Sequence, residues 1–124
     1  AFLQAQGLIL IAQNWQQPRV GELDLIMLEK GQAWSILVFI EVRQRQRSGF
    51  GNAALSVTKS KQYKIIKAAR YFLQQHPEYN DYECRFDVIA YDTNTKNNSR
   101  DVKETTSKNT QPEWLQGAFI ASAW

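Results

Sequence analysis

Acidic side chains interrupt two runs of residues that otherwise have the composition of buried β-strands. The first run contains Glu22 and Asp24, and the second contains Glu41 followed by Arg43. A buried carboxylate without a partner is costly, so it is normally paired, protonated or bound to a metal ion. Two acids on neighbouring strands, with a cation two residues after the second acid, are therefore a candidate site for metal-assisted phosphodiester hydrolysis.

The two runs have the pattern of a β-hairpin. Residues 23–28 and 36–42 are rich in branched side chains, and the short spacer between them is polar and contains glycine. This combination is typical of two antiparallel strands joined by a tight turn. The pattern predicts a turn centred between Gly31 and Gln32.

Such a turn would bring the acids together on one side of the sheet. It places Glu22 opposite Glu41 and makes Asp24 a diagonal neighbour of Glu41. Diagonal neighbours lie roughly 7–8 Å apart at the backbone, so their carboxylates can share one divalent ion. The alternative is a Glu–Arg ladder at the end of an exposed strand; the apolar character of both faces of residues 36–42 favours the shared site. The predicted face carries Glu22, Asp24, Phe39, Glu41 and Arg43.

Composition predicts one folded domain over residues 1–124 with a basic segment. The chain has 44% hydrophobic residues, a formal net charge of +3 and a pI near 9.1. From Arg43 to Arg70 there are cations and no acids, as expected where a phosphate backbone approaches, although a solvated helix face after a basic loop explains the charges equally well. These cations are Arg43, Arg45, Arg47, Lys59, Lys61, Lys64, Lys67 and Arg70.

Cysteine and histidine chemistry is nearly excluded. Cys84 is the only cysteine and His76 the only histidine, so an intramolecular disulfide and a thiolate metal cluster are ruled out. This usage fits a reducing, cytoplasmic location. No apolar run approaches the roughly 20 residues that span a membrane. Residues 2–7 resemble the last turn of a helix, so we expect that residues upstream of Ala1 complete a first helix.

The remaining elements predict an α/β fold. The order is helix, three strands, helix, strand, which implies a mixed sheet with helices packed on it. Residues 92–111 are polar and are expected to form a mobile loop. The other predicted elements are a strand at 8–15, a helix from 53 or 56 to 75, a strand at 83–91 and a closing element at 112–119.

Several short motifs together resemble the bacterial YraN family. They are residues 7–15, 21–26, 39–43, Phe50-Gly51, Val57-Thr58 with Lys61, residues 85–88 and Ala118-Phe119. That family looks like a branch of the PD-(D/E)xK nuclease superfamily, close to archaeal Holliday-junction resolvases. The resemblance implies a restriction-endonuclease-like αβββαβ core with a mixed central sheet flanked by helices. It also implies that Asp24 is the first acid, Glu41 the second and Arg43 the replacement for the usual lysine, with a further acid upstream of Ala1.

The resemblance implies a particular chemistry at these residues. Asp24 and Glu41 offer hard oxygen ligands suited to Mg²⁺ or Mn²⁺, with the carbonyl of Val42 as a third. The absence of histidine and thiol ligands argues against zinc. Arginine stays charged, so Arg43 would clamp phosphate or stabilise the transition state and would be a poor general base.

Other polar residues are candidates for supporting roles. Glu22 would add a ligand or, as we favour, pair with Arg19 or Arg43. Arg85 and Asp87 share a strand face, which favours a structural ion pair over a catalytic role. The nucleic-acid-binding candidates are Arg45, Arg47, Lys59, Lys61 and Lys64. The accessory candidates are Glu22, Gln62 and Asp87.

The sequence as a whole predicts a Mg²⁺- or Mn²⁺-dependent endonuclease that acts on structured or branched DNA. The alternatives are a module that binds nucleic acid without cutting it, and an interaction domain of a DNA-processing complex with a vestigial site. A homodimer would fit the need for two sites to cut two strands, but no residue of this chain supports one.

Overall fold

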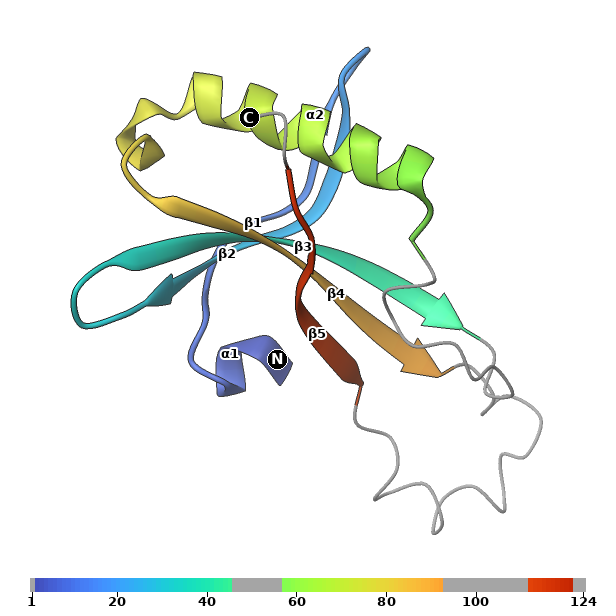
Figure 1. Ribbon diagram of the computed structural model, residues 1–124, viewed down its shortest axis with the longest axis horizontal. Helices are drawn as coiled ribbons and strands as arrows, with labels where there is room; N and C mark the ends of the chain where they lie inside the picture. Colours follow the sequence, from blue (N-terminus) through green and yellow to red (C-terminus); the bar gives the residue numbers. More distant parts are fainter. Residues whose placement is uncertain (1, 46–56, 93–111, 122–124) are drawn as a thin grey trace, which may run out of the picture.

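A five-stranded mixed sheet forms the centre of the protein (Figure 1). The computed structural model describes residues 2–45, 57–92 and 112–121. The strands lie in the order β1-β2-β3-β4-β5, and every neighbouring pair is antiparallel except β3 and β4. The elements are α1 (Phe2–Ala5), β1 (Ile9–Gln17), β2 (Gly21–Lys30), β3 (Ser35–Arg45), α2 (Lys59–Gln75), the 3-10 helix η2 (Pro77–Tyr79), β4 (Glu83–Asp92) and β5 (Glu113–Phe119).

The one parallel pair follows from the crossover between β3 and β4. The chain leaves β3, passes through α2 and returns to β4 in the same direction, as parallel strands require. The predicted α/β class and mixed sheet are therefore confirmed. The closing element predicted at 112–119 is the strand β5, which pairs with β4 at the edge of the sheet. A mobile loop was predicted at residues 92–111. Its first residue, Asp92, ends β4, and residues 93–111 lie outside the described part of the chain.

The register of the β2–β3 hairpin differs from the prediction by two residues. Lys30 pairs with Ser35, so the turn is centred one position later than expected. Gly31 N donates to the carbonyl oxygen of Trp34 at 2.9 Å, and a Cβ on Gly31 would lie 2.5 Å from that oxygen. The close approach explains the glycine and the position of the turn. Because the shift is two residues, side chains of β3 and of β2 from Leu25 onwards stay on their predicted faces. Before Leu25 the alternation of β2 breaks, since Leu23 packs in the same cluster as Ile26 and Phe39.

The two faces of the sheet are covered by different helices (Figure 1). On the side that we call the α2 face, Phe39 of β3 and Phe86 of β4 belong to the same buried cluster as Phe72 of α2. On the opposite side, the α1 face, Val38 and Ile89 belong to a second cluster. Leu3 of α1 is part of that second cluster. Burial on both faces agrees with the nearly continuous apolar sequences of β3 and β4.

The start of α2 is later than the sequence predicted. Thr58 has an extended backbone, and its side chain accepts a hydrogen bond from Lys61 N at 3.1 Å, so Thr58 is the N-cap and the helix begins at Lys59. Gly21, with φ of +142°, lies at the start of β2, and a Cβ there would lie 3.6 Å from Ala68 Cβ. The cap fixes the start of α2, and this close approach lets the middle of the helix pack against the start of β2.

Candidate metal and nucleic-acid site

The Asp24 carboxylate forms a hydrogen bond to β3 just beyond the last backbone pair of β2 and β3. The last paired residues are Leu25 and Ile40. Beyond them, Asp24 Oδ2 accepts a hydrogen bond from the backbone N–H of Val42 at 2.8 Å. The two acids therefore lie on adjacent strands, where the sequence predicted a diagonal relationship, and the contact that fixes Asp24 is with the residue after Glu41.

Glu41 is a nearly buried carboxylate with two cationic neighbours. Its exposed fraction is 5%. Glu41 Oε2 accepts a hydrogen bond from Arg43 Nη1 at 3.2 Å and lies 3.8 Å from Lys61 Nζ. Burial raises the pKa of Glu41 above its ordinary value, and the charge of Asp24 raises it further, while Lys61 and Arg43 act in the opposite direction.

A hollow of about 370 Å³ lies beside Asp24. It is lined mainly by polar side chains, and one of them, Asn14, has a φ of +52° in the middle of β1. Asn14 is opposite Asp24 in the β1–β2 register, between the pairs Gln13–Leu25 and Trp15–Leu23. The lining residues are Gln13, Asn14, Asp24, Leu25, Val42 and Gln44. Space and polar groups thus adjoin one of the two acids.

The donor set fits a hard divalent cation. Burial raises the pKa of Glu41 and the charge of Asp24 raises it further, so a cation bound to both carboxylates would compensate their charges. Asp24 and Glu41 are the carboxylate ligands this site offers; among the described residues, no three His, Cys, Asp or Glu side chains are grouped to hold a metal. Backbone carbonyls such as that of Val42, and water, would complete the shell, as they do for Mg²⁺.

Lys61 has a protein partner that the sequence did not predict. Its predicted contact with phosphate stays a prediction, and the structure places its ammonium group at Glu41. The signal in the sequence was its position in the first turn of the helix that follows the second acid, but that position does not identify the partner. Lys59 and Lys64 of the same helix are exposed. The Arg45 side chain and Arg47 lie outside the described part of the chain.

Two accessory candidates have local structural partners. Gln62 Nε2 donates to the carbonyl oxygen of Val57 at 3.1 Å, which ties the start of α2 to the preceding residues. Glu22 accepts a hydrogen bond from Gln16 Nε2 at 3.3 Å, and Gln16 is its paired neighbour on β1. In the described part of the chain, the hydrogen-bond partner of Glu22 is thus this amide, whereas the sequence favoured Arg19 or Arg43.

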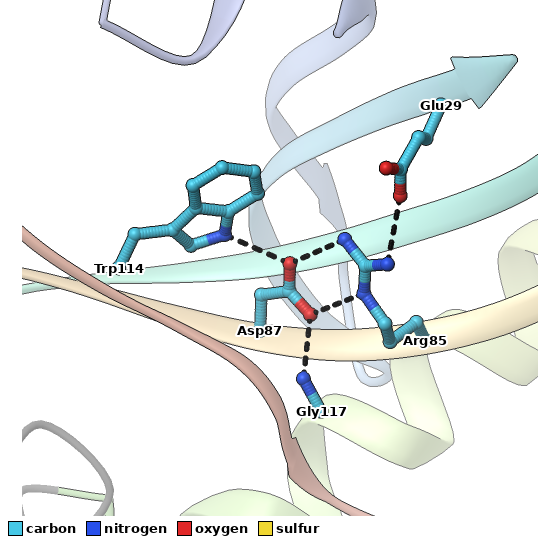
Figure 2. A network of polar contacts seen from close by, with 5 residues as sticks. All are labelled: Glu29, Arg85, Asp87, Trp114 and Gly117. Atoms are coloured by element: carbon cyan, nitrogen blue, oxygen red, sulfur yellow. Dashed lines mark hydrogen bonds and ion pairs between the residues drawn. The ribbon is translucent and has the colours of Figure 1, made fainter. Parts of the chain in front are cut away.

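Asp87 belongs to a separate network on the α1 face (Figure 2). Arg85 donates to both of its oxygens, from Nε at 2.9 Å and from Nη2 at 3.0 Å. Trp114 Nε1 donates at 2.9 Å and the backbone N–H of Gly117 at 3.0 Å. Arg85 Nη1 also donates to Glu29 at 2.7 Å. Asp87 is completely buried, and these bonds explain how its charge is tolerated.

This network bears on two predictions. Asp87 lies apart from the cluster of Asp24 and Glu41, because it projects from the sheet face opposite to that of Glu41. The favoured structural ion pair between Arg85 and Asp87 is confirmed. Trp114 and Gly117 were missed, because they are 27 and 30 residues from Asp87 in the sequence and no local pattern links them to β4.

Cys84 has no sign of nucleophilic activation. It is half-buried on β4, and burial raises the pKa of its thiol above the ordinary value. Because the thiolate is the reactive form, this environment disfavours nucleophilic chemistry at Cys84. Neither described α-helix is both long and apolar enough to cross a membrane.

The fold and the site define an α/β protein in which a mixed sheet carries two acids at the end of a hairpin, near one cation of the sheet and one of α2. The chain belongs to the UPF0102 family, an uncharacterised protein family whose family model matches residues 1–91. That range includes Asp24, Glu41, Lys61 and Asp87, whereas β5 lies beyond it.

The most similar relatives found include other UPF0102 proteins of bacteria. A UPF0102 protein of Psychrobacter arcticus is 70% identical over 131 residues, which cover 99% of this chain and 76% of that relative. One from Psychrobacter sp. strain PRwf-1 is 55% identical over 123 residues, covering 99% of this chain and 82% of the relative. One from Pseudomonas savastanoi pv. phaseolicola is 53% identical over 89 residues, covering 72% of this chain and 68% of the relative.

Proposed function

We propose that this protein is a metal-dependent DNA endonuclease that hydrolyses phosphodiester bonds in structured or branched DNA. The observation that carries the proposal is Glu41, a nearly buried acid next to Asp24 that two cations approach. A protein has little structural reason to place like charges together at the end of a hairpin. A divalent cation would bind the two acids together, and a phosphate would bind the two cations that now contact Glu41.

Each residue has a role that its chemistry allows. Asp24 and Glu41 would hold Mg²⁺ or Mn²⁺, with the Val42 carbonyl as a further ligand. The bound ion would polarise the phosphoryl oxygen and lower the pKa of an attacking water. Arg43 is permanently charged, so it would stabilise the negative charge that develops on the phosphate and would not act as a base. The N–H of Val42 holds Asp24 in place for this purpose.

Two further arguments support a nuclease acting on DNA. The order of elements, a helix, three strands, a helix and a strand, agrees with the restriction-endonuclease-like core implied by the resemblance to the YraN branch of the PD-(D/E)xK superfamily. Lys59 and Lys64 are exposed on the same helix that carries Lys61. Exposed cations beside a metal site are suited to a phosphate backbone. The cytoplasmic location remains part of the proposal.

One observation favours a second candidate, a module that binds nucleic acid without cutting it. The acids already have protein partners: Asp24 has the Val42 N–H, and Glu41 has Arg43 and Lys61. A site whose charges are balanced internally is stable without metal, so the acids would then be structural. Cleavage separates the two candidates.

The test is a cleavage assay with branched, single-stranded and linear duplex DNA in Mn²⁺. The wild type should cut the branched substrate, and Glu41→Gln should be inactive. Arg43→Lys should retain cleavage because it keeps the charge, and Arg43→Ala should lose about 10²-fold or more, as removal of a transition-state donor does. Wild-type protein that binds these DNAs but cuts at the rate of Glu41→Gln would establish the non-cleaving module instead.

A further inference from the structure

One carboxylate oxygen of Glu41 forms ion pairs with two cationic side chains. Oε2 lies 3.2 Å from Arg43 Nη1 and 3.8 Å from Lys61 Nζ. Together with Asp24, whose charge also acts on Glu41, the cluster contains two negative and two positive side chains. Their formal charges cancel. The protein therefore neutralises its own metal-binding acids when no metal is bound.

The two cations hold Glu41 in different ways. Arg43 lies two residues along the same strand and donates a hydrogen bond from a planar guanidinium group. Lys61 comes from a different element, α2, and its distance of 3.8 Å is an ion pair longer than a hydrogen bond. The Lys61 side chain is 34% exposed and has a flexible stem with a compact, strongly hydrated charge. Lys61 is thus the cation that can leave Glu41 at lower cost.

We propose that Lys61 is an internal counter-ion of Glu41 that a divalent cation displaces, and that the released ammonium group then binds the phosphodiester of the DNA substrate. The proposal rests on the metal site of the proposed function and adds a regulation of that site. In the free protein Lys61 opposes metal binding through charge repulsion and by occupying Glu41. Once metal and DNA are both present, the same lysine contributes to substrate binding.

This exchange couples the two ligands. Metal binding frees Lys61 for phosphate, and phosphate binding removes Lys61 from Glu41, so each ligand increases the affinity for the other by the same factor. Metal should consequently bind weakly to the protein alone and more tightly in the presence of DNA. Removal of the Lys61 charge should eliminate the contribution of this residue to the coupling.

The direct test is Mn²⁺ calorimetry on the DNA-free protein. Lys61→Met keeps the apolar stem and removes the charge, and it should bind Mn²⁺ about fivefold to tenfold more tightly than wild type. This range is the effect expected for one unit charge near 4 Å from a partly solvated site. Lys67→Met removes an exposed charge from the same helix and should change the affinity less than twofold. Lys61→Arg, which keeps the charge, should resemble wild type.

The second measurement is the affinity for branched DNA, with and without Ca²⁺ as a hard cation in place of Mn²⁺. Ca²⁺ should strengthen DNA binding by wild type more than DNA binding by Lys61→Met. Thermal unfolding of each variant establishes that it is folded. Lys61→Met that binds Mn²⁺ no more tightly than wild type overturns the inference and leaves the proposed function intact. Failure of wild type and all variants to bind Mn²⁺ rejects the metal site itself, and the inference with it.

Discussion

The Asp24 carboxylate accepts a hydrogen bond from the backbone N–H of Val42 at 2.8 Å, at the position where β2 and β3 stop pairing through their backbones. The acid is therefore part of the hairpin as well as a candidate ligand. Burial is the main cause of the raised pKa of Glu41, and the charge of Asp24, held by this bond, raises it further. The same side chain thus supports the hairpin and is the proposed metal ligand.

Substitutions at Asp24 should separate these two contributions. Asp24→Ala removes the acceptor of the Val42 N–H and should cost about 1–3 kcal/mol of unfolding free energy. Asp24→Asn keeps an oxygen that can accept this bond and removes a charge close to Glu41, so its unfolding free energy should be clearly higher than that of Asp24→Ala. Urea unfolding of both variants in metal-free buffer measures the difference. Equal stability of the two would show that the hydrogen bond contributes little.

Glu41→Gln should change the pH dependence of stability. The pKa of Glu41 is raised in the folded state above its ordinary value of 4.5. Its protonated form thus contributes stability below about pH 4.5, and this contribution is lost as pH rises through the folded pKa. The stability of Glu41→Gln minus that of wild type should therefore be larger near pH 7 than near pH 4. Arg43 and Lys61 lose a charged partner in this variant, but both are about one-third exposed and can contact water.

Urea unfolding over this pH range, without metal and with Mn²⁺, measures the effect. Mn²⁺ should stabilise wild type near pH 7 and have little effect on Glu41→Gln. A stability difference between wild type and Glu41→Gln that does not vary with pH would contradict the raised pKa.

The network around Asp87 should be one of the most sensitive positions in the protein. All four of its hydrogen-bond contacts come from donors, so the NH₂ group of an asparagine at this site would face another donor. Asp87→Asn should destabilise the protein by about 3–5 kcal/mol, the usual cost of breaking a buried ion pair. Glu29→Gln weakens the more exposed end of the same network and should cost about 1 kcal/mol or less. Chemical denaturation of both variants tests this order, and similar costs would contradict it.

The exposed lysines of α2 should contribute to DNA affinity by binding backbone phosphates. Replacing Lys59 and Lys64 with Gln should weaken binding to all DNA sequences alike. The slope of log affinity against log salt should fall by roughly 0.9 for each duplex phosphate that is no longer neutralised. Fluorescence anisotropy at several salt concentrations measures the slope, with Lys67→Gln as the control. An unchanged slope would mean that these lysines are ordinary solvated surface.

The sequence by itself determined the order of the main elements and the shared face of Glu41 and Arg43. Alternation along a strand is a local property of the backbone, so these two residues could be assigned to one face although the turn was misplaced by one position. Burial of both faces of β3 followed from its apolar composition in the same way. The Arg85–Asp87 pair could be predicted for the same reason, because both residues lie on one strand and project to the same side. The face of Asp24 could not be assigned in this way, because the alternation of β2 breaks between Leu23 and Leu25.

Only the tertiary structure decided which residues meet across elements. Lys61 reaches Glu41 because Thr58 caps α2 and the helix packs against β2, and Trp114 reaches Asp87 because β5 pairs with β4. Local sequence fixes the direction of a side chain relative to its own backbone, but not which other element lies beside it. That choice follows from the packing of the whole core, where many apolar contacts together outweigh any single polar pair. The partners of Glu41 and Asp87 are consequences of that packing.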